Sequence, residues 1–240
     1  MNPFHRNLTC TLALSALLAS CAAPPSSSSS SDAGAIKVIY SQIYPDGSIL
    51  KEKPSEIRMV TRDATSKNVA AQVGLNAVLL AMGAFSFRGF SKDDLKGSEL
   101  TDVADRSHLQ NPVPTEFVGR LQARVDAFVQ TDESLQKRRF ERPLIVGGGN
   151  VRLVYESLLG TEEEKFRLKT DLVVYKKRES SAMASLMAPV VVECSGKSPD
   201  AWPQSRWAQE NYLLVKVQLD ELLQACETKV QGNLHQLLNG

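Results

Sequence analysis

The chain has 240 residues, and 42% of them are hydrophobic, an ordinary share for a globular protein with one sizeable core. Its 28 Lys and Arg residues nearly balance its 27 Asp and Glu residues, which gives a formal net charge of +1. Proteins that bind nucleic acids carry a clear basic excess. The composition therefore argues against a nucleic acid as partner.

The first thirty residues carry a targeting pattern. Residues 8–20 are mostly Leu and Ala, follow a short stretch containing Arg6, and are too few to span a bilayer. The apolar run ends at Leu18-Ala19-Ser20-Cys21, and six consecutive serines follow at residues 26–31. This order of Leu, two small residues and Cys resembles the signal of bacterial lipoproteins.

The resemblance implies cleavage before Cys21 and attachment of a diacylglycerol to its thiol. An amide-linked acyl chain on the new N-terminus adds to the diacylglycerol, and stable anchoring needs at least two acyl chains. Ala22 in place of Asp implies sorting to the outer membrane. We expect a signal peptide at 1–20, a Ser-rich tether at 21–35 and a single domain at 36–240, in the periplasm or at the cell surface. An ordinary secretory signal cleaved nearby is the alternative.

The first half of the domain is predicted to open with strands. Ile36–Tyr40, Ile49–Leu50 and Ile57–Val60 form a hairpin or meander around the turn signal Tyr44–Gly47. A helix over about 67–85, a polar connection over 92–112 and a helix over about 115–130 follow.

The second half is predicted to contain mostly strands. Leu144–Val146 and Val151–Leu158 are expected as two strands around a flexible hairpin turn at Gly147-Gly148-Gly149-Asn150. Phe166–Tyr175 is predicted to be a strand in which apolar side chains alternate with Arg167, Lys169 and Asp171. This alternation indicates that one face of the strand is buried and the other is exposed to solvent. A strand at Pro189–Cys194 and a helix from about Pro203 to Val230, ending near Gly232, complete the domain. This order predicts an α+β fold with an antiparallel sheet of about five to seven strands, packed with two or three helices.

Two cysteines fall inside the predicted domain. Cys194 shares one face of its strand with Val190 and Val192, and Cys226 lies on the apolar stripe of the C-terminal helix. Both sulfurs therefore point to the same interior, and an oxidising periplasm favours a disulfide. Two buried free thiols that never meet are the alternative.

The domain shows no catalytic pattern. Its histidines are His108 and His235, so spacing supports neither a His-based metal cluster nor a compact Ser-His-Asp set. The glycines at 147–149 lack the Gly-Lys-Ser/Thr ending of a phosphate-binding loop, and Arg152 stands where a dinucleotide-binding loop has its third glycine. We expect no metal, no cofactor and no catalytic residue.

Val69–Phe87 is the segment most able to contact a partner or a membrane. It holds only three conventional polar side chains and has small residues at steps of three and four: Ala70, Gly74, Ala77, Ala81 and Ala84. Such a seam lets another backbone approach closely, as in helices that pack in membranes, and it equally describes a core helix lying on a sheet. Its length is borderline for a bilayer, so both interpretations stay open.

The leading functional hypothesis is an outer-membrane-anchored lipoprotein with a non-enzymatic domain that binds a protein partner. It would serve as an envelope assembly or accessory component, or as a periplasmic immunity protein, and a neutral domain would bind through an apolar or shape-complementary patch. One alternative is a membrane-inserting or oligomer-forming lipoprotein that uses residues 69–87. Another is an envelope hydrolase whose carboxylates only the fold brings together.

Overall fold

The structure, a computed structural model, describes residues 35–63, 65, 97–157, 163–179 and 188–239. The chain divides into two units, Met1–Asp32 and Ala33–Gly240, and every described residue belongs to the second. Cys21 and the segment Val69–Phe87, with its seam of Ala70, Gly74, Ala77, Ala81 and Ala84, lie outside the described residues. In the described ranges, no helix combines the length and the apolarity that crossing a membrane requires.

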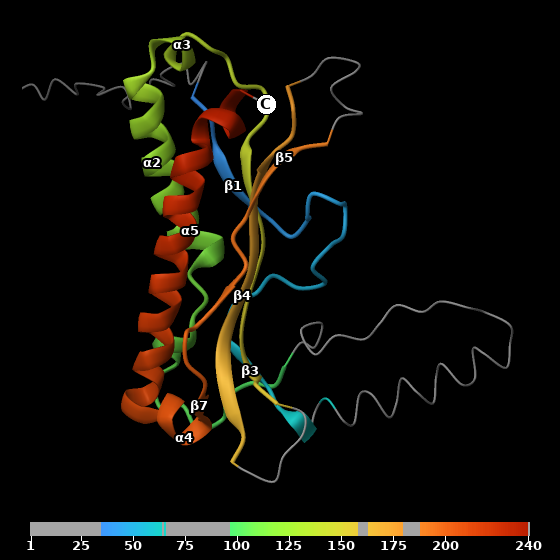
Figure 1. The fold of residues 1–240 in the computed structure, drawn as a ribbon, viewed down its shortest axis with the longest axis vertical. Coiled ribbons are helices and arrows are strands. Elements are labelled where there is room, and N and C mark those ends of the chain that lie inside the picture. Colours follow the sequence, from blue (N-terminus) through green and yellow to red (C-terminus); the bar gives the residue numbers. More distant parts are fainter. Residues whose placement is uncertain (1–34, 64, 66–96, 158–162, 180–187, 240) are drawn as a thin grey trace, which may run out of the picture. The chain divides into compact units, whose positions relative to one another are not determined.

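A mixed sheet of seven strands forms the centre of the described fold (Figure 1). Its two long strands, β3 (Leu144–Tyr155) and β4 (Lys165–Lys176), pair antiparallel along nearly their whole length. On the free side of β3, β1 (Val38–Ser41) and β2 (Arg58–Val60) pair in parallel with successive stretches of that strand. Three short strands pair antiparallel with β4 along its other side: β5 (Val190–Glu193), β6 (Gly196–Lys197) and β7 (Trp202–Pro203).

The α+β class is confirmed, but the sheet is mixed where an antiparallel one was predicted. Residues 61–143 separate β2 from β3, and a connection of that length allows the chain to return to the same end of the sheet before β3 begins. β1 and β2 each pair with β3, so the predicted opening meander is wrong. The turn inside it is confirmed, since Gly47 N donates to Tyr44 O at 3.0 Å and Ile43 pairs with Ile49.

β3 is one bent strand where two strands and a hairpin turn were predicted. Gly148 and Gly149 have φ values of +81° and +88°, and the register against β4 shifts there in a β-bulge. A Cβ on Gly148 would lie 2.6 Å from Tyr44 Oη, and one on Gly149 would lie 2.7 Å from Val113 Cγ1. The glycines therefore bend the strand beneath close neighbours and do not reverse the chain.

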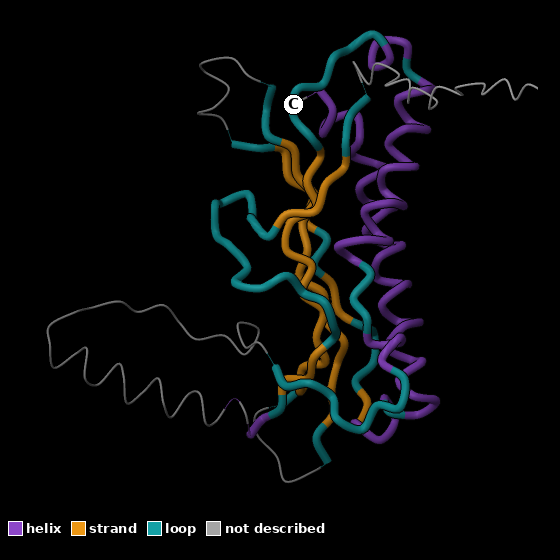
Figure 2. The backbone as a smooth tube through the Cα atoms, turned by 180° about the vertical axis from the view of Figure 1, so that it is seen from behind, coloured by secondary structure: helices purple, strands orange, loops and turns teal. Residues whose placement is uncertain are grey.

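Helices α2 (Val118–Thr131) and α5 (Leu213–Asn239) cover one face of the sheet (Figures 1 and 2). A π-helical turn, η3 (Val113–Phe117), leads into α2, and the prediction of this helix is confirmed. α5 continues through Gly232, where an end was predicted, and buries Leu234, Leu237 and Leu238 beyond it. A helical glycine costs about 1 kcal/mol, whereas each buried leucine contributes about 1.5–3 kcal/mol. Burial of these three leucines therefore outweighs the cost of Gly232 and extends α5 beyond it.

Short helices connect these elements: η2 (Arg106–Leu109), α3 (Glu133–Gln136), α4 (Gln204–Trp207) and η5 (Gln209–Tyr212). Just before α5, three non-glycine residues adopt positive φ, namely Glu210, Asn211 and Tyr212. Asn211 Oδ1 accepts hydrogen bonds from the backbone N–H groups of Ala104 and Asp105, at 2.9 and 3.2 Å. These contacts hold the left-handed turn in place and join it to the connection before η2.

Polar contacts tie α2 to its neighbours. Glu227 of α5 has a side chain only 3% exposed, and its carboxylate lies 2.6 Å from Arg120 and 2.8 Å from Arg124 of α2.

Gln122 of α2 covers the unpaired edge of β1, because its Oε1 accepts from Val38 N at 2.7 Å. This contact satisfies an edge N–H that a further strand would otherwise pair with.

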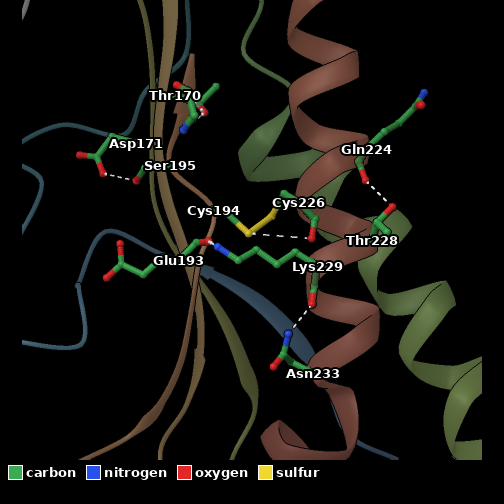
Figure 3. The surroundings of a disulfide bond; sticks show 11 residues. Thr170, Asp171, Glu193, Cys194, Ser195, Gln224, Cys226, Thr228, Lys229 and Asn233 are labelled. Atoms are coloured by element: carbon green, nitrogen blue, oxygen red, sulfur yellow. Dashed lines mark hydrogen bonds between the residues drawn. A yellow bond between two sulfur atoms is a disulfide. The ribbon is translucent and has the colours of Figure 1, made fainter. Parts of the chain in front are cut away.

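Cys194 and Cys226 form the predicted disulfide (Figure 3). The sulfurs are 2.08 Å apart and the Cα atoms 5.1 Å apart, and both residues are buried. The bond fastens the residue that follows β5 to the middle of α5.

Candidate functional site

The face of the sheet turned away from α2 and α5, here called the outer face, is the strongest candidate for a functional surface. Loop 42–57, which connects β1 to β2, lies on this side (Figures 1 and 2). On β4 the alternation predicted from sequence is confirmed: Phe166, Leu168, Leu172 and Val174 belong to the core beneath the helices. The side chains between them, including Lys169 and Asp171, lie on the outer face and line its depressions.

One end of the outer face is apolar. Ile39, Ile145, Tyr175 and Val191 stand opposite one another in register across four strands, and we call them the apolar row. The two outermost members remain accessible, with Ile39 41% and Val191 37% exposed. Loop 42–57 adds Ile43, which is 43% exposed and whose carbonyl oxygen accepts from Tyr175 Oη at 2.9 Å. Exposed large apolar side chains gathered at one end of a face are typical of a protein-binding surface.

The other end of the outer face is basic. Arg58, Arg152, Lys169 and Lys197 stand in register across β2, β3, β4 and β6, and we call them the basic row. Along β4 the apolar row and the basic row are six residues apart, from Tyr175 to Lys169, which corresponds to about 20 Å of strand. Arg58 at one end of the row is paired with Glu99, whose Oε1 lies 3.3 Å from its Nη2.

A hydrogen-bonded carboxylate lies between the two rows. Asp171 accepts from Tyr44 Oη at 3.0 Å and from Ser195 Oγ at 3.3 Å, and Figure 3 shows the second contact on the side of the sheet away from the disulfide. Burial, followed by the charge of Asp171, raises the pKa of the Tyr44 phenol far above its usual value. Burial also raises the pKa of Tyr40 to about 12, and its hydroxyl donates to Gly148 O at 2.9 Å. Both tyrosines therefore stay neutral and act as donors that fix loop 42–57 and β1 to the bulge.

Within the part of the chain that the structure describes, no imidazole lies beside the Ser195–Asp171 pair. His108 lies on η2, with Nδ1 3.0 Å from Asn211 O, and His235 lies on α5, which covers the opposite face of the sheet. A serine needs an adjacent general base to become a nucleophile, so this pair lacks the geometry of a hydrolase triad. Among the described residues, no group of three or more His, Cys, Asp and Glu side chains could hold a metal ion.

The structure describes only one of the sites predicted from sequence, the cysteine pair. Cys194 and Cys226 are brought together, whereas the lipidation residue Cys21 and the small-residue seam of 69–87 lie outside the described residues. Sequence reasoning missed both rows on the outer face, because each row takes its members from strands far apart in the chain. The signal that sequence offered was the single alternating strand β4.

Comparison of the chain with models of protein families, with curated proteins and with solved structures finds no match.

Proposed function

We propose that this chain is a lipoprotein of the bacterial cell envelope, anchored to the outer membrane through Cys21, whose domain binds a protein partner through the outer face. Such a protein would act as an assembly factor or accessory subunit. The motif that ends at Cys21 supports the anchor. The Cys194–Cys226 disulfide supports the compartment, because disulfides form and persist in oxidising environments such as the periplasm.

The apolar row is the observation that carries the binding proposal. Ile39 and Val191 are accessible at its ends, and polar side chains border it, with Glu193 exposed on the same strand as Val191. An apolar centre with a polar rim is the usual anatomy of a protein interface. A lipid bilayer fits less well, because Glu193 and Asp171 lie beside the row and hydrocarbon would strip water from their charges.

Crosslinked pull-downs from intact cells test the binding surface. Ile39→Asp and Val191→Asp each place a charge on the apolar row, and Val217→Asp is the matched control, since Val217 is 46% exposed on α5. We expect wild type and Val217→Asp to capture the same protein, and both row variants to capture much less of it. Equal recovery of the partner with wild type and all three variants would show that the outer face is not the binding surface.

Metabolic labelling with palmitate tests the anchor. Cys21→Ala is expected to abolish the label and to leave either an unprocessed precursor or a soluble product, because alanine offers no thiol for the diacylglycerol. Retention of the label in Cys21→Ala would contradict the proposed acylation site.

A further inference from the structure

The edge of β5 that points away from β4 presents backbone groups that the sheet itself does not use. Cys194 N donates to a carbonyl oxygen of β4 at 3.0 Å, and the residues that bond to a neighbour alternate along an antiparallel strand, so Val192 also faces β4. Val191 and Glu193 therefore direct their N–H and C=O groups away from the sheet. Lys229 of α5 supports this direction, because its Nζ donates to the carbonyl oxygen of Glu193 (Figure 3).

The strands on the opposite side of the sheet have their edges covered. Along β1, the side-chain amide of Gln122 accepts from one outward N–H at 2.7 Å and donates to one outward C=O at 3.0 Å. Along β2, Met59 and Ser98 exchange two backbone hydrogen bonds of 2.9 and 2.7 Å. Within the described ranges, no contact of this kind covers the outward N–H and C=O of Val191. An apolar edge strand with unpaired backbone groups is a template for another strand.

This edge of β5 is complementary to itself. When two copies pair antiparallel about Val191, each Val191 donates to and accepts from the other. Two residues along the strand, Glu193 N–H meets the carbonyl oxygen of Pro189 in the second copy. Pro189 has no N–H to offer in return, and the Glu193 carbonyl oxygen that would have accepted from it is already bonded to Lys229. The pairing therefore satisfies the outward backbone groups of all three residues that take part in it.

The side chains next to the edge are compatible with this pairing. Val190 and Val192 pack against the core beneath the helices, so the residues that alternate with them, Pro189 and Val191, have side chains on the outer face. Lys229 reaches the edge from the side of α5. Its side chain therefore lies on one face of the joined sheets, and those of Pro189 and Val191 lie on the other.

We propose that two copies of this chain pair antiparallel through the edges of β5, about a two-fold axis at Val191. The two sheets then form one, and the apolar row of one copy continues into that of the other. The contact is small compared with stable interfaces, so the dimer is weak in solution, and the proposed anchor on a shared membrane raises the effective concentration of the two copies. The pairing uses backbone groups and does not depend on the protein partner of the proposed function.

Sedimentation equilibrium of the full-length protein, in a detergent matched in density to the solvent and at up to about 100 µM protein, tests the dimer. Val191→Pro removes the outward N–H, and proline is tolerated at such positions of edge strands. Val191→Thr keeps this N–H and the branched shape, and is the matched control. We expect wild type and Val191→Thr to dimerise with similar affinity, and Val191→Pro to dimerise about tenfold or more weakly, because each copy loses a donor. A monomeric wild type, a dimer unchanged by Val191→Pro, or a dimer lost in Val191→Thr would overturn the proposal.

Oxidative crosslinking in intact cells tests the geometry and does not require the proline variant to fold. Residues that exchange both hydrogen bonds across an antiparallel pair have Cα atoms about 5.5 Å apart, within the range that a disulfide spans. Val191→Cys should therefore give a covalent dimer on non-reducing gels. Val217→Cys, at a position 46% exposed on α5, should not. Dimers from both variants or from neither would overturn the pairing.

Ile39→Asp separates the dimer from the proposed function. Ile39 lies on β1, at the end of the apolar row away from β5. This variant should lose the protein partner and keep the dimer with unchanged affinity. Loss of the dimer in Ile39→Asp would show that the copies meet through the outer face and would overturn the pairing, whereas an unchanged dimer with full capture of the partner would count against the proposed binding surface alone.

Discussion

Breaking the disulfide between Cys194 and Cys226 should cost a large share of the domain's stability. The two residues are 32 positions apart, so the bond closes a loop of about 33 residues in the unfolded chain. On the chain-entropy account, this restriction contributes roughly 3–4 kcal/mol to the free energy of unfolding. For a domain of this size, the thermal midpoint should fall by about 10 °C when the bond is absent.

The assay compares urea unfolding of the oxidised protein with that of the protein reduced under denaturing conditions and refolded with reductant. Reduction keeps both sulfur atoms, so packing beneath α5 is preserved and the difference reports the crosslink. Cys194→Ala/Cys226→Ala should match the reduced protein to within the small cost of the lost sulfurs, and it should not respond to reductant. Identical midpoints for the oxidised and reduced proteins would show that the crosslink does not stabilise the domain, and alkylation of both thiols in the native state would show that the bond is absent.

Other perturbations follow from particular contacts. Glu227→Gln should destabilise the domain by about 1–3 kcal/mol by chemical denaturation, less than for a fully buried pair, because Arg120 and Arg124 are 37% and 44% exposed and keep part of their hydration; the exposed Glu221→Gln should change little, and similar losses for both would contradict the role of Glu227. Gly148→Ala should cost about 2–4 kcal/mol, since φ is +81° and the new Cβ would meet Tyr44. Gly119→Ala, in an open position on α2, should instead stabilise by about 0.5–1 kcal/mol, so equal effects of the two glycine changes in thermal melts would count against the bulge. Burial raises the pKa of Tyr40 and of Tyr212 to about 12, and raises that of Tyr175 as well. Unfolded tyrosines ionise near pH 10 while these stay neutral, so stability should fall as the pH rises above 10, and ultraviolet absorbance should show tyrosinate appearing together with unfolding. Complete ionisation near pH 10 in a folded protein would show that the phenols are solvated.

Features set by local periodicity were predictable from sequence. Alternation in Phe166–Tyr175 identified both faces of β4, and the apolar stripes placed α2 and most of α5. The disulfide was predictable because Cys194 and Cys226 each sit on a buried stripe of an element expected to face the same core.

Features set by remote partners were not predictable from sequence. Glycines 147–149 have the composition of a turn, and only the positions of Tyr44 and Val113 show that they bend a continuous strand. The parallel pairing of β1 and β2 depends on where the chain returns after residue 143, which no local pattern states. For the same reason neither row on the outer face was visible, since each is a product of the register between strands.

Site-specific photocrosslinking in living cells tests whether the outer face binds a protein partner. A photoreactive amino acid replaces Ile39 on the outer face in one strain and Val217 on α5 in another, and both positions are more than a third exposed. We expect one discrete crosslinked protein from position 39, in the membrane fraction, and none from position 217. Adducts of the same protein from both positions, or from position 217 alone, would show that the partner does not bind at the outer face.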